Sequence, residues 1–157
     1  MIGVTYALLD FAEAYPMTLQ HTIVMETGGM KGRREELTRE EVHQLLKQQW
    51  KIDQVHSEYG MTELLSQGYS PGKGIFYPTD TLKVFLRAED DPFDVKRRVP
   101  PDRPFISGAI NIIDLANVYS CSFIATDDMG KLNADGSFEV LGRLDNSDVR
   151  GCGLMLL

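Results

Sequence analysis

The stretch His56-Ser-Glu-Tyr-Gly-Met-Thr-Glu63 ends with an aromatic ring, a glycine, a hydroxyl and a carboxylate within five residues. Gly60 allows a sharp turn and a close approach of the backbone to a ligand. Thr62 can donate a hydrogen bond to a phosphate oxygen, and Glu63 supplies the hard oxygens that Mg²⁺ prefers. Tyr59 can lie against a nucleotide base or pack in the core. These residues alone fit a ligand-binding turn and an ordinary capped turn equally well.

The residues before this stretch predict alternating helices and strands. The apolar spacing from Val4 to Ala14 favours a short helix, and Leu19 to Met25 has the composition of a buried strand. Thr38 and Glu41 form a capping-box pattern that opens a second helix. Ile52 to Val55 then predicts the strand that leads into the tyrosine stretch. The result is a βαβ-type segment, in which ligands usually bind at the carboxyl ends of the strands.

From Gly74 onward the sequence changes to β character. Ala88 to Pro104 is charged and rich in proline, which predicts a long exposed excursion, and Asn133 to Gly136 predicts a hairpin turn. The expected strands are Ile75–Tyr77, Leu82–Leu86, Phe105–Ile113, Ser120–Ala125, Met129–Leu132 and Phe138–Leu141. We therefore predict an α/β fold, with an α/β segment over residues 1–74, a small β-barrel-like subdomain over 75–145 and a tail over 146–157.

Three further patterns carry groups suited to a nucleotide. Gly28 and Gly29 follow a predicted strand, where glycines permit close backbone approach. Asp128, in Thr126-Asp-Asp128, is expected at a strand end, where its carboxylate can accept hydrogen bonds from both hydroxyls of a ribose. Gly142-Arg-Leu-Asp145 follows the last predicted strand. Taken singly, each pattern is better explained by an ordinary turn or an exposed ion pair.

Together and in this order, the patterns resemble the motifs of the adenylate-forming enzymes, which include acyl-CoA synthetases and adenylation domains. Tyr59-Gly-Met-Thr-Glu63 is similar to the central motif of that superfamily. The resemblance implies that Tyr59 stacks on adenine, that Thr62 contacts the α-phosphate, and that Glu63 holds Mg²⁺. It also implies that Gly28 and Gly29 lie along the adenine, and that ATP and Mg²⁺ are the cofactors.

The downstream patterns have counterparts in the same superfamily. Asp128 matches the aspartate that binds the ribose, although Asp127 stands where these enzymes usually have glycine. Gly142-Arg-Leu-Asp145 resembles the segment that marks the hinge between the large domain and the C-terminal lid. The resemblance implies that Arg143 reaches the ribose or a phosphate and that Asp145 is the pivot. The predicted fold is accordingly part of the large domain of an adenylate-forming enzyme.

Three phrases resemble the acyl-protein synthetases of bacterial luminescence systems, namely residues 27–33, 58–64 and 150–154. This resemblance implies a carboxylic (fatty) acid that is activated as an acyl-adenylate and passed to the catalytic cysteine, Cys152, ahead of reduction by a partner acyl reductase. Cys121 lies in a strand-like stretch and is expected to be a small buried residue. An aryl-CoA or acyl-CoA ligase is the nearby alternative. A non-catalytic module that binds nucleotide or docks to a partner is the other.

The ends of the chain lack two parts of the resembled enzymes. No Ser/Thr/Gly-rich phosphate loop precedes Gly28, and no C-terminal lid with a catalytic lysine follows Asp145. We therefore expect a fragment from the later half of the large domain, inactive alone, whose partner is the N-terminal half of the same enzyme.

Composition excludes several other classes. Among 157 residues, 43% are hydrophobic and 25% are charged, as in an ordinary globular domain. The net charge of −7 argues against a nucleic-acid surface, and the apolar runs are too short to span a bilayer. Two cysteines form no disulfide framework and suggest a reducing compartment, so we predict a cytoplasmic protein. The three histidines share no metal-ligand spacing.

Overall fold

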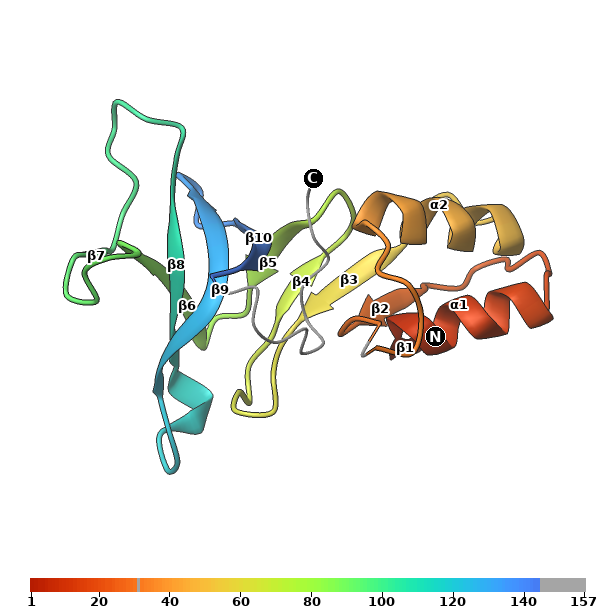
Figure 1. Cartoon of the computed structure of the whole chain (residues 1–157), viewed down its shortest axis with the longest axis horizontal. Coiled ribbons are helices and arrows are strands. Elements are labelled where there is room, and N and C mark those ends of the chain that lie inside the picture. The colour runs from red at the N-terminus through yellow and green to blue at the C-terminus, as the bar shows by residue number, and fades with distance from the viewer. Residues whose placement is uncertain (31, 145–157) are drawn as a thin grey trace.

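The computed structural model describes residues 1–30 and 32–144 of the chain. Its helices lie toward the N-terminus and most of its strands follow them (Figure 1). In chain order the elements are β1 (Ile2–Val4), α1 (Thr5–Ala14), β2 (Met25–Thr27), α2 (Arg39–Trp50), β3 (His56–Tyr59), β4 (Gly68–Ser70), β5 (Ile75–Pro78), β6 (Leu82–Arg87), β7 (Val95–Lys96), β8 (Phe105–Asp114), the 3₁₀ helix η1 (Leu115–Asn117), β9 (Phe123–Asn133) and β10 (Phe138–Arg143).

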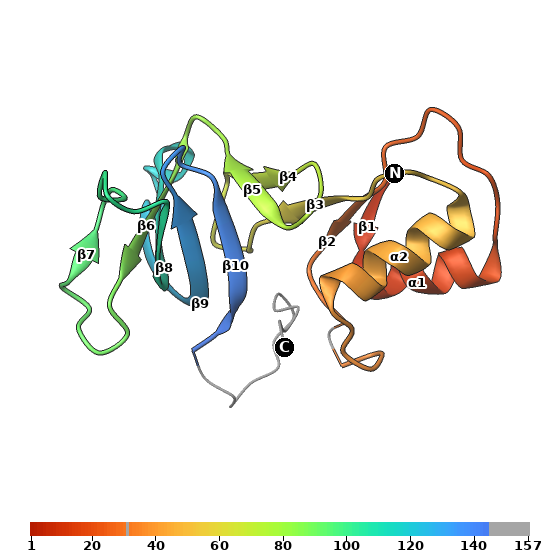
Figure 2. The ribbon, with the colours of Figure 1, turned by 90° about the horizontal axis from the view of Figure 1, so that it is seen from above.

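All the described strands belong to one mixed sheet, in the order β1-β2-β3-β4-β5-β10-β9-β8-β6-β7. Strands β1, β2 and β3 run parallel, and every other pairing is antiparallel. Seen from above, β10 lies between β5 and β9 and joins the two parts of the molecule (Figure 2). The α/β class is therefore confirmed.

The predicted β-barrel-like closure of residues 75–145 is wrong. Within the described residues the sheet is open, because its two end strands, β1 and β7, each pair with one neighbour only. Strand β7 is also only two residues long. A barrel over residues 75–145 would require β7 to pair with β5, and β5 pairs with β4 and β10 instead.

Helix α2 begins where the sequence predicts. The Glu41 amide donates to Thr38 Oγ1 at 3.3 Å, and the Thr38 amide donates to Glu41 Oε2 at 2.8 Å. These reciprocal bonds satisfy two backbone donors at the helix start and confirm the capping box. At the other end, Lys51 adopts a left-handed conformation with φ of 55°, which ends the helix.

Two of the expected strands are displaced along the chain. The stretch predicted over Leu19 to Met25 forms a strand only at Met25–Thr27, and that predicted over Ile52 to Val55 forms one at His56–Tyr59. Val24 and Val55 are fully buried against the helices instead. The apolar residues of these stretches are therefore buried beneath α1 and α2. The strand that pairs with β2 is the more polar β3.

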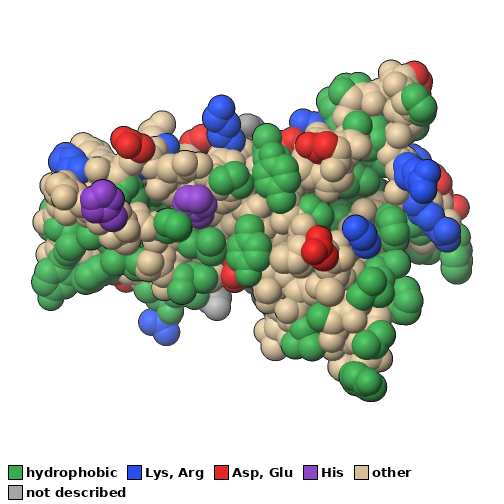
Figure 3. Space-filling model, turned by 180° about the vertical axis from the view of Figure 1, so that it is seen from behind, with side chains coloured by type: hydrophobic (Ala, Val, Ile, Leu, Met, Phe, Trp, Pro, Cys, Tyr) green, Lys and Arg blue, Asp and Glu red, His purple; other side chains and the backbone are tan. Residues whose placement is uncertain are grey.

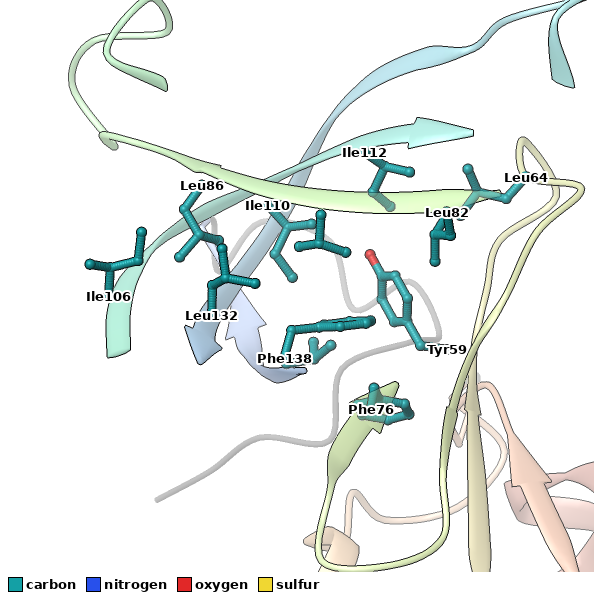
Figure 4. Close-up of a cluster of buried hydrophobic side chains, with 12 residues drawn as sticks. Tyr59, Leu64, Phe76, Leu82, Leu86, Ile106, Ile110, Ile112, Leu132 and Phe138 are labelled. Carbon is teal, nitrogen blue, oxygen red and sulfur yellow. The ribbon is translucent and has the colours of Figure 1, made fainter. Parts of the chain in front are cut away.

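Two hydrophobic clusters form the core. The helical cluster contains Leu8, Leu9, Ala12, Val24, Met30, Val42, Leu46, Trp50 and Val55. The β cluster contains Tyr59, Leu64, Phe76, Leu82, Val84, Leu86, Ile106, Ile110, Ile112, Leu132, Phe138 and Val140, most of them labelled in Figure 4. Residues 55–59 connect the two, because Val55, just before β3, lies in the first cluster and Tyr59, the last residue of β3, lies in the second.

The long strands β8 and β9 support the β cluster. Strand β9 begins at Phe123 and continues to Asn133, so Asp128 lies inside a strand and not at a strand end as the sequence indicated. The hairpin predicted between β9 and β10 is confirmed, since the Gly136 amide donates to the Asn133 carbonyl at 3.0 Å. Between Ala88 and Pro104 the described chain forms only the short strand β7.

Large apolar side chains also lie on the surface. Phe93, Tyr119 and Phe123 are among the most exposed, and the view from behind shows hydrophobic side chains spread over both parts of the molecule (Figure 3). No helix within the described residues is long and apolar enough to cross a membrane.

Candidate functional site

Two of the predicted glycine positions meet at one edge of the sheet. Gly28 directly follows β2 and Gly60 directly follows β3, and these strands are parallel neighbours with Thr27 opposite Glu58. Both glycines line one small hollow, together with Glu26, Arg39, Glu58, Tyr59, Phe76 and Val140. The hollow lies at the carboxyl ends of parallel strands, the usual place for a ligand in such a sheet, and in this structure its volume of about 20 Å³ has room for a water molecule.

Gly28 lies in a turn whose shape depends on glycine. Its φ of 70° falls in the left-handed region, which side chains with a Cβ rarely adopt. The Thr5 hydroxyl lies 2.9 Å from the Gly28 carbonyl oxygen and 2.9 Å from Glu26 Oε2, and it can donate its proton to either. Gly29 is the next residue of the same turn and is buried. The start of α1 therefore holds the glycine turn in place.

Gly60 differs, because its conformation does not require glycine. Its φ is not in the left-handed region. Among the described residues, a Cβ added there would meet only the Cγ of Gln67, at 3.2 Å, which is part of a flexible side chain. A side chain at Gly60 would therefore crowd Gln67, whose flexible side chain can shift to make room.

Tyr59, Asp128 and Arg143 come together from three strands. The Tyr59 hydroxyl donates to Asp128 Oδ2 at 2.9 Å, and Arg143 Nε lies 3.6 Å from Asp128 Oδ1. Asp128 and Arg143 are opposite each other in the β9–β10 ladder. Tyr59 reaches them from the end of β3, so residues from three separate sequence motifs share one carboxylate.

The Asp128 carboxylate is buried, with 4% of the residue exposed. Burial raises its pKa, while the hydrogen bond from Tyr59 and the charge of Arg143 act in the opposite direction; the net shift is upward. The neighbouring Asp127 adds to the rise by like-charge repulsion. Asp128 is therefore a buried hydrogen-bond acceptor, and the hydrogen bond from Tyr59 and the charge of Arg143 favour its ionised form.

The ring of Tyr59 lies inside the β cluster. Its centroid is 6.0 Å from that of Phe76 and 5.4 Å from that of Phe138, both in edge-to-face geometry, and the residue is 4% exposed. Figure 4 shows the ring among these neighbours. In this structure the ring has no open face for a base, so stacking on adenine stays a prediction that would require the ring to leave the cluster.

Thr62 and Glu63 lie in the turn that follows β3, and both are exposed. Their side chains are accessible to a ligand. No group of three or more histidine, cysteine, aspartate or glutamate side chains within the described residues is arranged to hold a metal. A single exposed carboxylate suits Mg²⁺ bound jointly with phosphate oxygens, which is how Mg²⁺ is usually held beside nucleotides.

Sequence reasoning missed Arg39, which lines the same hollow as Gly28 and Gly60. Its guanidinium carbon lies 5.3 Å from the ring centroid of Phe76, and its buried Nε has no hydrogen-bond partner among the described residues. Burial lowers its pKa, opposed by the charges of Glu26, Glu40 and Glu139. A cation in the first turn of a helix opposes the helix dipole, and this was the signal that could have drawn attention to it.

The remaining predicted positions fall in other places. Cys121 is exposed and not buried as expected, because β9 begins only at Phe123 and Cys121 precedes it. Its thiol donates to the Phe123 carbonyl at 3.4 Å. Asp145 and Cys152 lie outside the described residues.

No protein-family profile matches this sequence, and neither does any curated protein. Solved structures do match its fold. A mutant form of coronafacic acid ligase from Pectobacterium brasiliense has a TM-score of 0.61 at 15% identity, covering 91% of this chain and 29% of that one. Apo MatB from Rhodopseudomonas palustris has a TM-score of 0.60 at 17% identity, covering 92% and 31%.

A third match is O-succinylbenzoate coenzyme A synthetase (MenE) from Bacillus subtilis, with a TM-score of 0.59 at 18% identity, covering 96% of this chain and 33% of that one. At such low identity the likeness shows the fold alone. The chain therefore shares its fold with part of these structures and spans about a third of their length.

Proposed function

We propose that this chain is the nucleotide-binding part of an ATP-dependent ligase that activates a carboxylic acid as an acyl-adenylate. The observation that carries the proposal is the meeting of Tyr59, Asp128 and Arg143, from three motifs of the resembled superfamily, around one buried carboxylate. Gly28 and Gly60 line a hollow that Tyr59 also lines. The shared fold of known acyl-CoA ligases supports the same assignment.

The described residues suit ATP and Mg²⁺. Asp128 provides an acceptor for ribose hydroxyls, and Arg143 a cation beside it. Thr62 offers a hydroxyl for the α-phosphate, and Glu63 an exposed carboxylate for Mg²⁺. The metal would supply positive charge where negative charge develops on phosphorus. One structure of O-succinylbenzoate coenzyme A synthetase was determined in complex with ATP and magnesium ion, which supports this choice of ligands.

The proposed reaction has two steps. A carboxylate oxygen of the acid attacks the α-phosphorus of ATP; a P–O bond forms and pyrophosphate leaves. A thiolate then attacks the acyl carbonyl, a thioester forms and AMP leaves. Arg143 and Asp128 hold the nucleotide in place through both steps, which is a positioning role.

We assign this activity to a larger protein or assembly that contains the chain. The chain spans about a third of the structures that it matches. Exposed aromatic residues, Phe93, Tyr119 and Phe123, offer apolar surface of the kind that further structure covers. The N-terminal half of the same enzyme is the proposed partner, and the acid pocket would lie largely outside this chain.

For the acceptor we propose a protein thiol, Cys152, with a fatty acid as substrate and an acyl reductase as the next partner. The Thr27–Arg33 and Glu58–Leu64 phrases support this choice. Coenzyme A is the second candidate acceptor, and it is favoured by the names of the matched structures, which include a malonyl-CoA ligase and a coenzyme A synthetase. A non-catalytic nucleotide-binding or docking module is the alternative of another class.

The test uses the full polypeptide with Mg-ATP and fatty acids of different length. Acid-dependent exchange of pyrophosphate into ATP is expected; its absence with every acid would leave the non-catalytic module as the better explanation. Labelled acid should then become attached to protein, be released by neutral hydroxylamine, and be lost in Cys152→Ser but not in Cys121→Ser. Formation of a coenzyme A thioester with no labelled protein would assign coenzyme A as the acceptor.

A further inference from the structure

The loop between β3 and β4 carries Thr62 and Glu63, whose side chains are exposed. A turn closes at its start, where the Leu64 amide donates to the Met61 carbonyl at 3.0 Å, and the Leu64 side chain is buried in the β cluster. Exposed side chains have no packing of their own to fix them. The positions of the Thr62 hydroxyl and the Glu63 carboxylate therefore depend on how firmly the backbone beneath them is held.

Asp114, the last residue of β8, holds the far side of this loop. It is completely buried. Its Oδ2 accepts hydrogen bonds from the Leu65 amide at 2.7 Å and the Ser66 amide at 3.0 Å. Its Oδ1 accepts from the Ser66 hydroxyl at 2.6 Å and the Ala116 amide at 3.0 Å. Four donors thus converge on one carboxylate that has no contact with solvent.

Asn117, three residues further on, holds the loop at Glu63 itself. Its Nδ2 donates to the Glu63 carbonyl oxygen at 2.7 Å and to the Cys121 carbonyl oxygen at 3.1 Å. The side chain is buried and belongs to η1. The candidate magnesium ligand is therefore fixed through its own backbone by a residue 54 positions later in the sequence.

These contacts form a clasp, defined here as Asp114 and Asn117 with the backbone of Glu63, Leu65 and Ser66. The clasp holds the loop both at Glu63 and two to three residues beyond it. Burying an ionised carboxylate is costly unless several donors satisfy it.

We propose that Asp114 and Asn117 are positioning residues that set the place of Thr62 and Glu63 for a magnesium-bound nucleotide. The proposal rests on the function proposed above. Groups that orient metal ligands without touching the metal typically influence metal affinity about 10- to 100-fold. The clasp would therefore act on the contribution of Mg²⁺ to ATP binding more than on ATP binding itself.

The test measures ATP affinity of the full polypeptide with Mg²⁺ and with EDTA, and takes the ratio as the magnesium-dependent gain. Asn117→Ala and Asp114→Asn are expected to lower this gain about tenfold or more, with little change in affinity in EDTA. Asn133→Ala and Asp135→Asn are matched controls, because Asn133 donates to Ser137 and Asp135 accepts from the Ser137 amide and hydroxyl in a distant hairpin. Both controls should keep the wild-type gain.

The outcomes separate the two proposals. ATP binding absent from the wild-type polypeptide would overturn the proposed function and the clasp together. Wild-type binding with an unchanged magnesium-dependent gain in Asn117→Ala would overturn the clasp alone. If the variants lost ATP affinity equally with Mg²⁺ and with EDTA, Asp114 and Asn117 would have a structural role alone. The same conclusion would follow if the control variants lost as much of the magnesium-dependent gain. If Asp114→Asn does not fold, Asn117→Ala alone carries the test.

Discussion

The Tyr59 hydroxyl donates a hydrogen bond of 2.9 Å to Asp128 across 69 positions of sequence. Each of the two residues is 4% exposed. The resemblance assigns one to adenine and the other to ribose, yet in this structure they satisfy each other. A nucleotide that uses both would have to replace this bond with its own.

Tyr59→Phe should destabilise the fold in a pH-dependent way. It removes a donor from a buried carboxylate, which typically costs about 1–3 kcal/mol at neutral pH. The hydrogen bond from Tyr59 lowers the pKa of Asp128, so the variant should raise that pKa further. Urea unfolding at pH 7 and pH 3 should show the larger loss at pH 7, because the Tyr59 hydroxyl stabilises the ionised form of Asp128. Tyr77→Phe is the control, because Tyr77 is half exposed; equal losses at both pH values would argue against an ionised partner.

Asp128→Asn and Asp128→Ala should separate folding from binding. The buried position means that Asp128→Ala leaves the Tyr59 hydroxyl without its acceptor, at a typical cost of about 1–3 kcal/mol of unfolding free energy. Asp128→Asn retains an acceptor and should fold normally. Because the folded pKa of Asp128 is raised, its contribution to stability is present at low pH and lost as pH rises through that pKa. The unfolding free energy of Asp128→Asn should therefore depend less on pH in this range than that of the wild type.

Both Asp128 variants should weaken ATP binding in the full polypeptide by about 1.5–3 kcal/mol, since each removes a charged acceptor. Titration calorimetry measures the binding, and urea unfolding between pH 3 and pH 8 measures the stability. Normal ATP affinity in Asp128→Asn would show that Asp128 serves the fold and not the nucleotide.

Asp114 should contribute to stability with a pH dependence opposite to that of Asp128, and Asp114→Asn should remove it. Burial opposes ionisation of Asp114, but the hydrogen bonds from Ser66, Leu65 and Ala116 outweigh it, so its pKa is lowered. A lowered folded pKa contributes stability above the unfolded value, about 3.9, and that stability is lost as pH falls through the folded pKa. Wild type should therefore lose stability below about pH 4 more steeply than Asp114→Asn. Parallel curves would mean that Asp114 is not ionised in the folded chain.

Gly60→Ala and Gly68→Ala should have contrasting effects. A Cβ at Gly68 would lie 2.9 Å from the Cζ of the buried Phe138 ring, and overpacking of this kind typically costs about 1–3 kcal/mol. Within the part of the chain that the structure describes, a Cβ at Gly60 meets only the flexible Gln67 side chain, so that variant should lose less stability than Gly68→Ala. If a nucleotide approaches the backbone closely at Gly60, Gly60→Ala should still weaken ATP binding. Unchanged ATP affinity in Gly60→Ala would remove Gly60 from the site.

The sequence alone determined the features that depend on neighbouring residues. The capping box at Thr38 and Glu41, the hairpin at Asn133 to Gly136 and the strands β5 and β6 all formed close to their predicted positions. Each depends on hydrogen bonds within a few residues or on local alternation of apolar side chains. The order of the motifs along the chain could also be identified from the sequence, because it does not depend on the distances between them in space.

The tertiary structure decided which groups meet and which are buried. Asp128 lies within β9 because pairing with β8 and β10 extends that strand beyond its apolar segment. Tyr59 lies in the core because the aromatic rings of Phe76 and Phe138 enclose it. The clasp at Asp114 and Asn117 joins residues about fifty positions apart, and the open edge at β7 follows from the pairing of distant strands. Contacts at such separations depend on chain topology, which the local sequence pattern does not encode.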